Sequence, residues 1–254
     1  MTLFSIKRSR LIQFCWQHLW LLISLYIMTL GVALCVRSNL GSSVISSIPM
    51  AFALAGEDGS ASSLTIGGYT NVMNIILVLL QIAVLRRRFE PVQLLQLIIG
   101  FLFGALIDLN MILTSYLDYS LPWQQVTAQL AGCTVMGVGI AMEIRCGSVT
   151  MPGEGIQVAM SRVTGLPFPK MKIIIDTVLV ALAVVSCYCF WGAWQWNIIG
   201  PGTLFAMLYV GFCVRLVGKH LGWFDRLLDY RPGFRRYIFG LARFIYSGFT
   251  RERK

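Results

Sequence analysis

The chain has 254 residues, of which 57% are apolar and only 13% are charged, and its formal net charge is +10. Soluble domains carry about 25% charged residues, so this composition excludes both a disordered chain and an ordinary soluble globule. The mean hydropathy of +0.72 agrees with the class that remains, an integral membrane protein.

Six apolar stretches are long enough to cross a bilayer, which takes roughly 20 apolar residues in a helix. The first stretch is longer than the apolar core of a signal peptide, and no small-residue cleavage site follows it. We therefore expect it to be retained as a helix. The predicted spans are 19–36, 66–85, 92–113, 126–142, 173–191 and 198–214.

The distribution of Lys and Arg predicts the orientation of these spans. If the basic N-terminus is cytoplasmic, alternation places Arg86–Arg88, the loop after the fourth span and the C-terminal tail on the same side. Arg37 is then the one basic residue on the opposite side, in agreement with the excess of positive charge on cytoplasmic loops. We expect a multi-pass protein of the bacterial cytoplasmic (inner) membrane with both termini in the cytoplasm.

Two further apolar segments, 42–55 and 148–162, are too short to cross. Helical segments of 10–14 residues are typical of re-entrant or interfacial structure. At membrane depth, irregular backbone is tolerated where it lines a cavity or is buried in protein. Because the charge pattern requires each segment to return to the side it left, we predict one re-entrant half-helix from each face.

The two halves of the chain are similar around these segments. Gly41 aligns with Gly147 at an offset of 106, and Gly100 aligns with Gly202 at an offset of 102. Each half reads as helix, half-helix, helix, helix, and its three crossings invert the second half relative to the first. Inverted repeats with broken helices at the membrane midplane are a recurring plan of secondary transporters.

The predicted fold is thus all-α, with six transmembrane helices in two inverted three-helix repeats. We expect an N-terminal segment (1–18), a first repeat (19–115), a second repeat (124–218) and a cytoplasmic tail (219–254). Apolar tail residues recur at helical spacing among arginines, which predicts an amphipathic helix on the anionic inner leaflet. The alternative, nucleic-acid binding, is disfavoured by the small size of the tail. The apolar residues of this pattern are Phe234, Ile238, Leu241, Phe244 and Ile245.

Glu154 is the leading candidate for a functional side chain. It lies in the second short segment, flanked by glycines in Pro152–Gly155, and such glycines permit a close approach of the backbone. Ionisable residues at membrane depth are costly and usually face a cavity or a partner. One interpretation is a carboxylate that binds a cation or carries a proton. The other is an ion pair with Arg37, Arg145 or Lys172 that only fixes the segment.

Asp176 and Lys172 are four residues apart, so the two side chains can pair on one helix face. Asn74 occupies the position equivalent to Asp176 in the first repeat and keeps a polar group at the same depth. These residues are expected to wall a site between the two half-helices. A structural ion pair at the membrane surface is the alternative.

The first short segment is rich in hydroxyl groups. Ser43, Ser46 and Ser47 precede and open its half-helix, and the chain reaches it through Arg37 and Asn39. Two half-helices that point their N-termini at the midplane would favour an anion or a polar neutral solute there. The alternative is that the serines satisfy backbone groups that the turn leaves free.

The chain also resembles the YczE/YyaS/YitT family of bacterial membrane proteins over residues 20–220. The resemblance depends on Gly31, Asn39–Gly41, Pro152–Gly155, Lys172 with Asp176, and Gly200 with Gly202 and Thr203. It implies a polytopic inner-membrane protein and carries no functional residues.

These features favour a small secondary transporter or channel for a small polar or anionic solute. The alternatives are an intramembrane scaffold or accessory subunit and, least favoured, a membrane-embedded enzyme. The sequence has no Ser-His-Asp set or phosphate-binding loop. The seven cysteines have no metal-binding spacing, so we expect no metal or cofactor. Expected partners are the bilayer and a small-molecule or ion substrate, and a homo-oligomer is left open.

Overall fold

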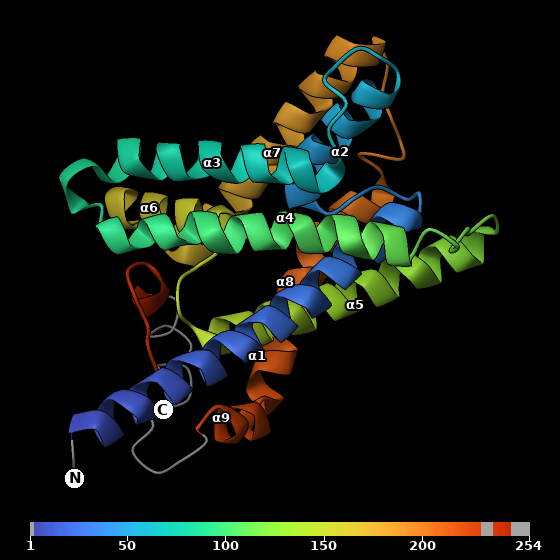
Figure 1. The fold of residues 1–254 in the computed structure, drawn as a ribbon. Coiled ribbons are helices and arrows are strands. Elements are labelled where there is room, and N and C mark those ends of the chain that lie inside the picture. The colour runs from blue at the N-terminus through green and yellow to red at the C-terminus, as the bar shows by residue number, and fades with distance from the viewer. Residues whose placement is uncertain (1–2, 230–235, 245–254) are drawn as a thin grey trace.

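The computed structural model describes residues 3–229 and 236–244, and within these ranges it contains helices and no strands. Six helices are long and apolar enough to cross a membrane, as predicted (Figure 1). These helices are α1 (Leu3–Arg37), α3 (Ile66–Leu85), α4 (Leu95–Leu113), α5 (Pro122–Cys146), α7 (Phe168–Trp191) and α8 (Pro201–His220). The shorter elements are α2 (Val44–Glu57), α6 (Pro152–Thr164), α9 (Gly222–Leu228) and the 3-10 turns η1 (Arg86–Arg88) and η2 (Pro91–Leu94).

Helices α1 and α5 form the central pair of the bundle. They approach closely because glycines lie at the contact: a Cβ atom on Gly132 would lie 2.9 Å from the backbone nitrogen of Cys35. The Sγ atoms of Cys35 and Cys133 are 3.8 Å apart across the same contact. Small residues permit this kind of close packing between helices in a bilayer. Helix α4 packs against α1, and α8 packs against α5.

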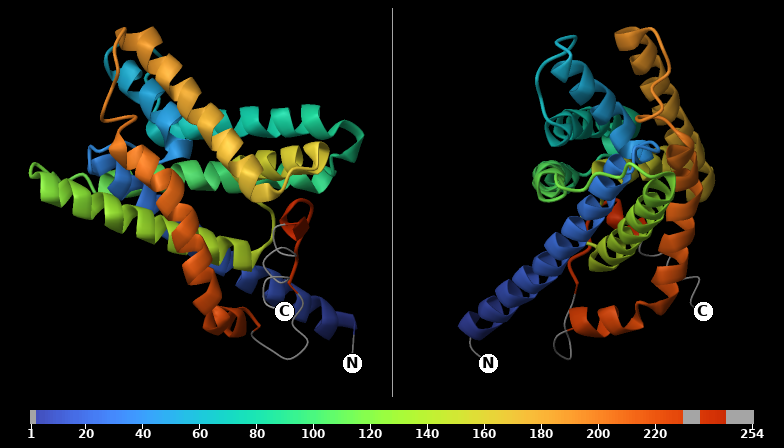
Figure 2. Two further views of the ribbon diagram at one scale, coloured as in Figure 1. Left: turned by 180° about the vertical axis from the view of Figure 1, so that it is seen from behind. Right: turned by 90° about the vertical axis from the view of Figure 1, so that its right-hand side faces the viewer.

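The two short helices, α2 and α6, start close together and run apart. A side chain added at Gly153, in the first turn of α6, would collide with Ile45 in the first turn of α2. The far end of α2 is tied to the end of α7, because the indole of Trp191 donates a 2.8 Å hydrogen bond to Asp58. The far end of α6 leads through a short loop into the start of α7. Figures 1 and 2 show α2 and α6 at opposite ends of α7.

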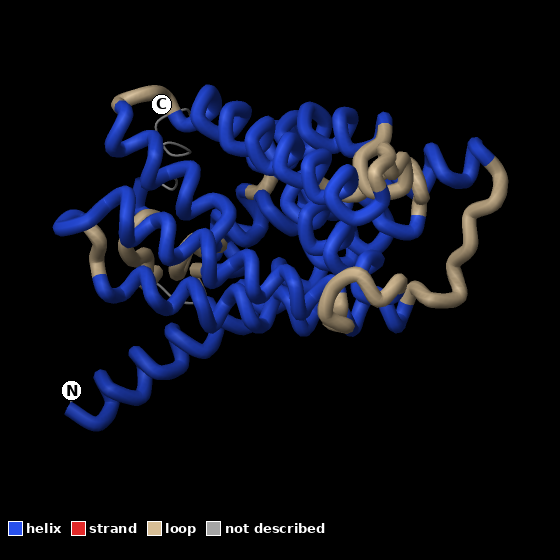
Figure 3. The backbone as a smooth tube through the Cα atoms, turned by 90° about the horizontal axis from the view of Figure 1, so that it is seen from above, coloured by secondary structure: helices blue, strands red, loops and turns tan. Residues whose placement is uncertain are grey.

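The two short helices make reciprocal contacts with the longer helices α3 and α7. Helix α2 packs against α3 and α7, and α6 packs against α7 and α3. Seen from above, the described part of the backbone consists mainly of helices joined by loops and turns (Figure 3). In contrast to the close α3–α4 pair, α7 diverges from α8 (Figure 2).

One end of the bundle, called here the basic end, carries the loops rich in Lys and Arg. An apolar cluster unites the end of α3, the second half of α6, the start of α7 and the C-terminal segment 236–244. The first turns of α1 extend beyond the predicted span to the same end, where Gln17 donates a 2.6 Å hydrogen bond to the carbonyl of Cys146.

The C-terminal segment 236–244 differs from the predicted amphipathic helix. It contains only a three-residue helical turn, at 242–244. Leu241 is 1% exposed and packs on protein, not on a membrane surface. The helical spacing of its apolar residues indicated one apolar face but not what covers it. Phe234 and Ile245 belong to the same prediction and lie outside the described residues.

Candidate functional site

The first turn of α6 forms the centre of the candidate site. Met151 is extended, and Pro152 fits the first helical turn because its missing N–H needs no acceptor there. Gly155 is pressed against α3 and α4: a Cβ atom at this position would lie 2.7 Å from the side-chain oxygens of both Gln81 and Gln96. Only a residue without a side chain lets α6 approach these two amides.

A group of buried glutamines surrounds this turn. Gln81, Gln93 and Gln96 are completely buried, and Gln157 is 4% exposed. Gln81 donates a 3.1 Å hydrogen bond to the carbonyl of Pro152, but its side-chain oxygen has no partner among the described residues. Neither amide atom of Gln93 or of Gln96 has one. A buried polar atom without a partner costs about 1–3 kcal/mol, so the group is unusual for a core that only packs.

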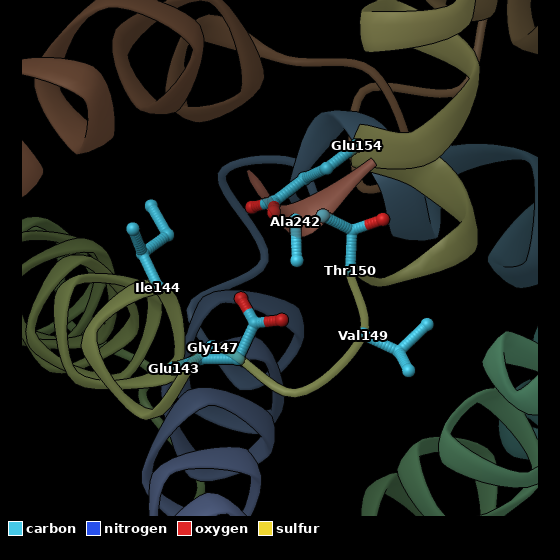
Figure 4. Close-up of a pocket in the computed structure, with 7 residues that line it drawn as sticks. All are labelled: Glu143, Ile144, Gly147, Val149, Thr150, Glu154 and Ala242. Atoms are coloured by element: carbon cyan, nitrogen blue, oxygen red, sulfur yellow. The ribbon is translucent and has the colours of Figure 1, made fainter. Parts of the chain in front are cut away.

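Two carboxylates face each other beside this group (Figure 4). Glu143 at the end of α5 and Glu154 in α6 line one small pocket, and their side chains point toward Ala242 from opposite sides. The pocket is narrow, with room for about one water molecule, and it is partly open to the surface. One oxygen of each carboxylate is buried and has no hydrogen-bond partner among the described residues. The full lining is Glu143, Ile144, Gly147, Val149, Thr150, Glu154 and Ala242.

Burial raises the pKa of Glu154 to about 7, because the charged form loses its hydration. The positive charge of Lys172 acts against this increase, and the negative charge of Asp176 adds to it. Glu154 can therefore gain or lose a proton near neutral pH.

Helix α7 connects to the site through Gln157. This side chain donates a 3.0 Å hydrogen bond to Asp176, whose other oxygen accepts a 2.9 Å bond from Lys172. The predicted pair of Asp176 and Lys172 is thus present, with Asp176 buried and Lys172 part-exposed. The structure brings these two residues close to Glu154 in an acidic and amide-lined region. Glu154 itself has no ion-pair contact among the described residues.

The serines just before and at the start of α2 form hydrogen bonds with one another and with nearby backbone groups. Ser43 donates a 2.9 Å hydrogen bond to Ser46, and Ser47 donates a 2.7 Å bond to the carbonyl of Val44. Within 38–57, no buried side-chain polar atom lacks a partner. These hydroxyls satisfy local groups, which is the second of the two interpretations given above.

Three other predicted site residues lie away from α6. Arg37 donates a 2.8 Å hydrogen bond to the carbonyl of Met111, next to the far end of α4. Asn39 is exposed and adopts a φ of 56° in the turn after α1. Asn74 packs against Gly100, with a 3.4 Å hydrogen bond to its carbonyl. The structure does not bring these residues together with Glu154.

Neither the glutamines nor Glu143 is among the site residues predicted from the sequence. Gln81 lies inside a predicted span, and Gln93 and Gln96 open the next one. Polar side chains within apolar spans are the signal that could have selected them. Their convergence on Gly155 depends on the packing of α3, α4 and α6.

Fold and site together define a multi-pass integral membrane protein of six long helices, with a buried polar site at the start of a short helix. A family model described as "Family of unknown function (DUF6198)" matches residues 15–219, most of the chain, and the chain belongs to this family. This match does not connect the chain to the YczE/YyaS/YitT family. No curated protein and no solved structure matches the chain.

Proposed function

We propose that this protein is a small secondary transporter or channel whose solute passes the start of α6, beside Glu154. The observation that carries the proposal is the concentration of unpaired buried polar atoms around α6. Side chains with such atoms come from α3, η2, α4, α5, α6 and the loop before α6, and they are Gln81, Gln93, Gln96, Glu143, Thr150, Glu154 and Gln157. A permanent packing contact gains nothing from them, whereas a polar solute or water can use them in turn.

The lining of the pocket favours a neutral polar or cationic solute. Among the described residues, Glu143 and Glu154 are the only ionisable groups in its lining, which includes no Lys or Arg from that part of the chain. Lys172, the basic group that influences Glu154, is paired with Asp176. An anion would meet like charge here, so we do not propose one as the solute. The helix N-terminus of α6 partly offsets this repulsion but does not remove it.

The inverted repeat remains part of the proposal. Exchanging the halves, so that α1 to α4 correspond to α5 to α8, converts the α2–α7 contact into α6–α3 and the α1–α4 contact into α5–α8. Each of these contacts is found in the structure. They support two re-entrant half-helices that meet near the midplane, because Ile45 and Gly153 are in contact.

We further propose that the basic end is cytoplasmic, that both termini are cytoplasmic and that the membrane is the bacterial inner one. The positive-inside rule supports this orientation. We expect a membrane-impermeant thiol reagent added outside to label Ser60→Cys and not Thr164→Cys in a cysteine-free background. Ser60 follows α2 and Thr164 ends α6. Equal labelling of the two sites would contradict both the orientation and the inversion.

The scaffold alternative also has support in one contact. Ile45, Ile48 and Ile156 pack with Met73 and Leu77 in an apolar cluster where α2, α3 and α6 meet. A dry contact of this kind suits a static scaffold, but it also suits a transporter with its two halves closed together. The neighbouring glutamine amides, which have no partner among the described residues, favour a transporter with its halves closed together.

The function is tested by comparing solute uptake between membrane vesicles that contain the protein and matched vesicles without it. We expect one or more polar solutes, neutral or cationic, to accumulate faster in the vesicles that contain the protein. Uptake profiles that do not differ across neutral, cationic and anionic metabolites would favour the scaffold.

A further inference from the structure

The C-terminal segment 236–244 is joined to the loop before α6 by a backbone hydrogen bond and to α1 by side-chain hydrogen bonds. The N–H of Phe239 donates a 2.9 Å bond to the carbonyl of Ser148, in the loop that leads into α6. Tyr237 and Gln17 of α1 form a two-bond pair: the Tyr237 N–H donates to the Gln17 side chain at 2.9 Å, and Gln17 donates back at 2.8 Å. The segment thus bridges α1 and the loop at 148.

Side chains of the segment fill the space beside α6. Leu241 packs in one apolar cluster with Leu85, Val158 and Ala159. Gly240 has a φ of +54°, and a Cβ atom there would lie 2.9 Å from Cγ of Gln93. This position therefore suits glycine on two grounds, conformation and space. The fit is that of a docked segment and not of a loose tail.

The docked segment also forms a wall of the acidic pocket. Ala242 is 5% exposed and lies between the carboxylates of Glu143 and Glu154 (Figure 4). Of the described lining residues, it alone comes from outside α5, α6 and the loop between them. Removing the segment would widen this pocket toward the basic end.

The loop before α2, which is the equivalent region of the first repeat, shows which contact the C-terminal segment replaces. There, the loop before α2 bonds directly to the loop before α8: Ser42 donates a 3.0 Å bond to Ile198, and Gly202 donates a 2.8 Å bond to Leu40. By the repeat, the loop at 148 should meet the start of α4 in the same way. Instead it bonds to Phe239, and neither amide atom of Gln96 at the start of α4 has a hydrogen-bond partner within the described part of the chain.

We propose that residues 239–244 of this segment are a removable plug that closes the basic-end entrance of the Glu143–Glu154 pocket, while Arg236 stays paired with Asp225 of α9. When the segment leaves, the pocket opens to the cytoplasm, and the loop at 148 becomes free to pair with the start of α4. The idea that a solute enters through this opening rests on the proposed function. The closing of the pocket by the segment does not, because it can be measured as access to the pocket alone.

The test measures how fast a small thiol reagent labels Thr150→Cys in the purified full chain, in a background without native cysteines. Leu241→Asp places a carboxylate at a buried apolar position and should release the plug. We expect its labelling rate to rise at least about tenfold, which corresponds to a shift of ~1.4 kcal/mol in the docking equilibrium. Arg243→Asp is the matched control, because Arg243 is an exposed residue of the same segment and its labelling rate should stay at the parent level.

A disulfide provides the second arm and does not depend on the stability of the Asp variant. Phe239→Cys and Ser148→Cys join residues that already share a backbone hydrogen bond, within the reach of a disulfide. This double-cysteine variant keeps the native Thr150, and its proton flux is measured in liposomes. Oxidation of the disulfide should block the flux, and a reductant should restore it. If Thr150→Cys labelling does not change in Leu241→Asp, the plug is contradicted. If labelling rises but no proton flux appears in any state, the plug holds and a proton path through the pocket is contradicted, whereas the proposed transport itself is decided by the vesicle uptake comparison.

Discussion

Replacing Asp225 by Asn is expected to lower the free energy of unfolding by about 3–5 kcal/mol, the cost of removing one partner from a buried ion pair. Asp225 in α9 accepts hydrogen bonds from both Arg145 and Arg236, whose side chains are 8% and 9% exposed. The change leaves two buried guanidinium groups facing a neutral amide. Arg145 also donates a 2.6 Å bond to the carbonyl of Gly218, so the ends of α5, α8 and α9 loosen together.

Asp229→Asn is the matched control for this prediction. Asp229 also pairs with Arg236, at 3.3 Å, but its side chain is 53% exposed. An exposed pair is worth about 0–1 kcal/mol, so this variant should unfold close to the wild type. Thermal unfolding of both variants in the same detergent measures the difference. Equal midpoints for Asp225→Asn and Asp229→Asn would show that the buried pair does not hold this end of the bundle.

Replacing Glu154 by Gln is expected to abolish the pH dependence of transport between about pH 6 and 8. Because burial raises the pKa of Glu154 to about 7, the carboxyl is mostly protonated below that pH and mostly ionised above it. Lys172 and Asp176 on α7 and Glu143 on α5 are the charged groups that face it. Gln resembles the protonated form at every pH, so flux in the variant should be flat with pH and strongly reduced if a proton is exchanged.

The same substitution is also expected to change how the stability of the fold depends on pH. A carboxyl whose pKa is raised in the folded state stabilises the fold at low pH and loses that contribution as pH rises toward 7. The wild type should therefore lose stability relative to Glu154→Gln between about pH 4.5 and 7. Glu57→Gln, an exposed glutamate at the end of α2, is the control and should change neither profile. A Glu154→Gln protein that fails to fold would favour the structural interpretation of this residue.

The number of crossing helices could be predicted because apolar length alone decides it. Each of the six predicted spans lies within or overlaps a long helix, and the two short segments are short helices as expected. Glu154 could be selected because a carboxylate between glycines is rare at membrane depth. The glutamine group could not, because its members come from four separate elements, α3, η2, α4 and α6, and meet only through the packing of these elements.

The serines and the tail show where pattern alone is ambiguous. A run of hydroxyls before a half-helix serves a solute or the local backbone equally well, and here Ser43 and Ser46 bond to each other. An apolar face at helical spacing covers either a membrane or the protein, and here Leu241 covers α3 and α6. In both cases the deciding information is which surface lies opposite, and that is set by residues far away in the sequence.

The central claim is that the solute passes the polar site beside Glu154. The most direct measurement is whether a solute found by the uptake comparison slows the labelling of Thr150→Cys, a residue of the pocket wall. We predict that labelling slows in proportion to occupancy and that labelling of Ser60→Cys, in the loop after α2, does not change. Uptake of the solute with no protection of Thr150→Cys at saturating concentration would place its path elsewhere and contradict the account.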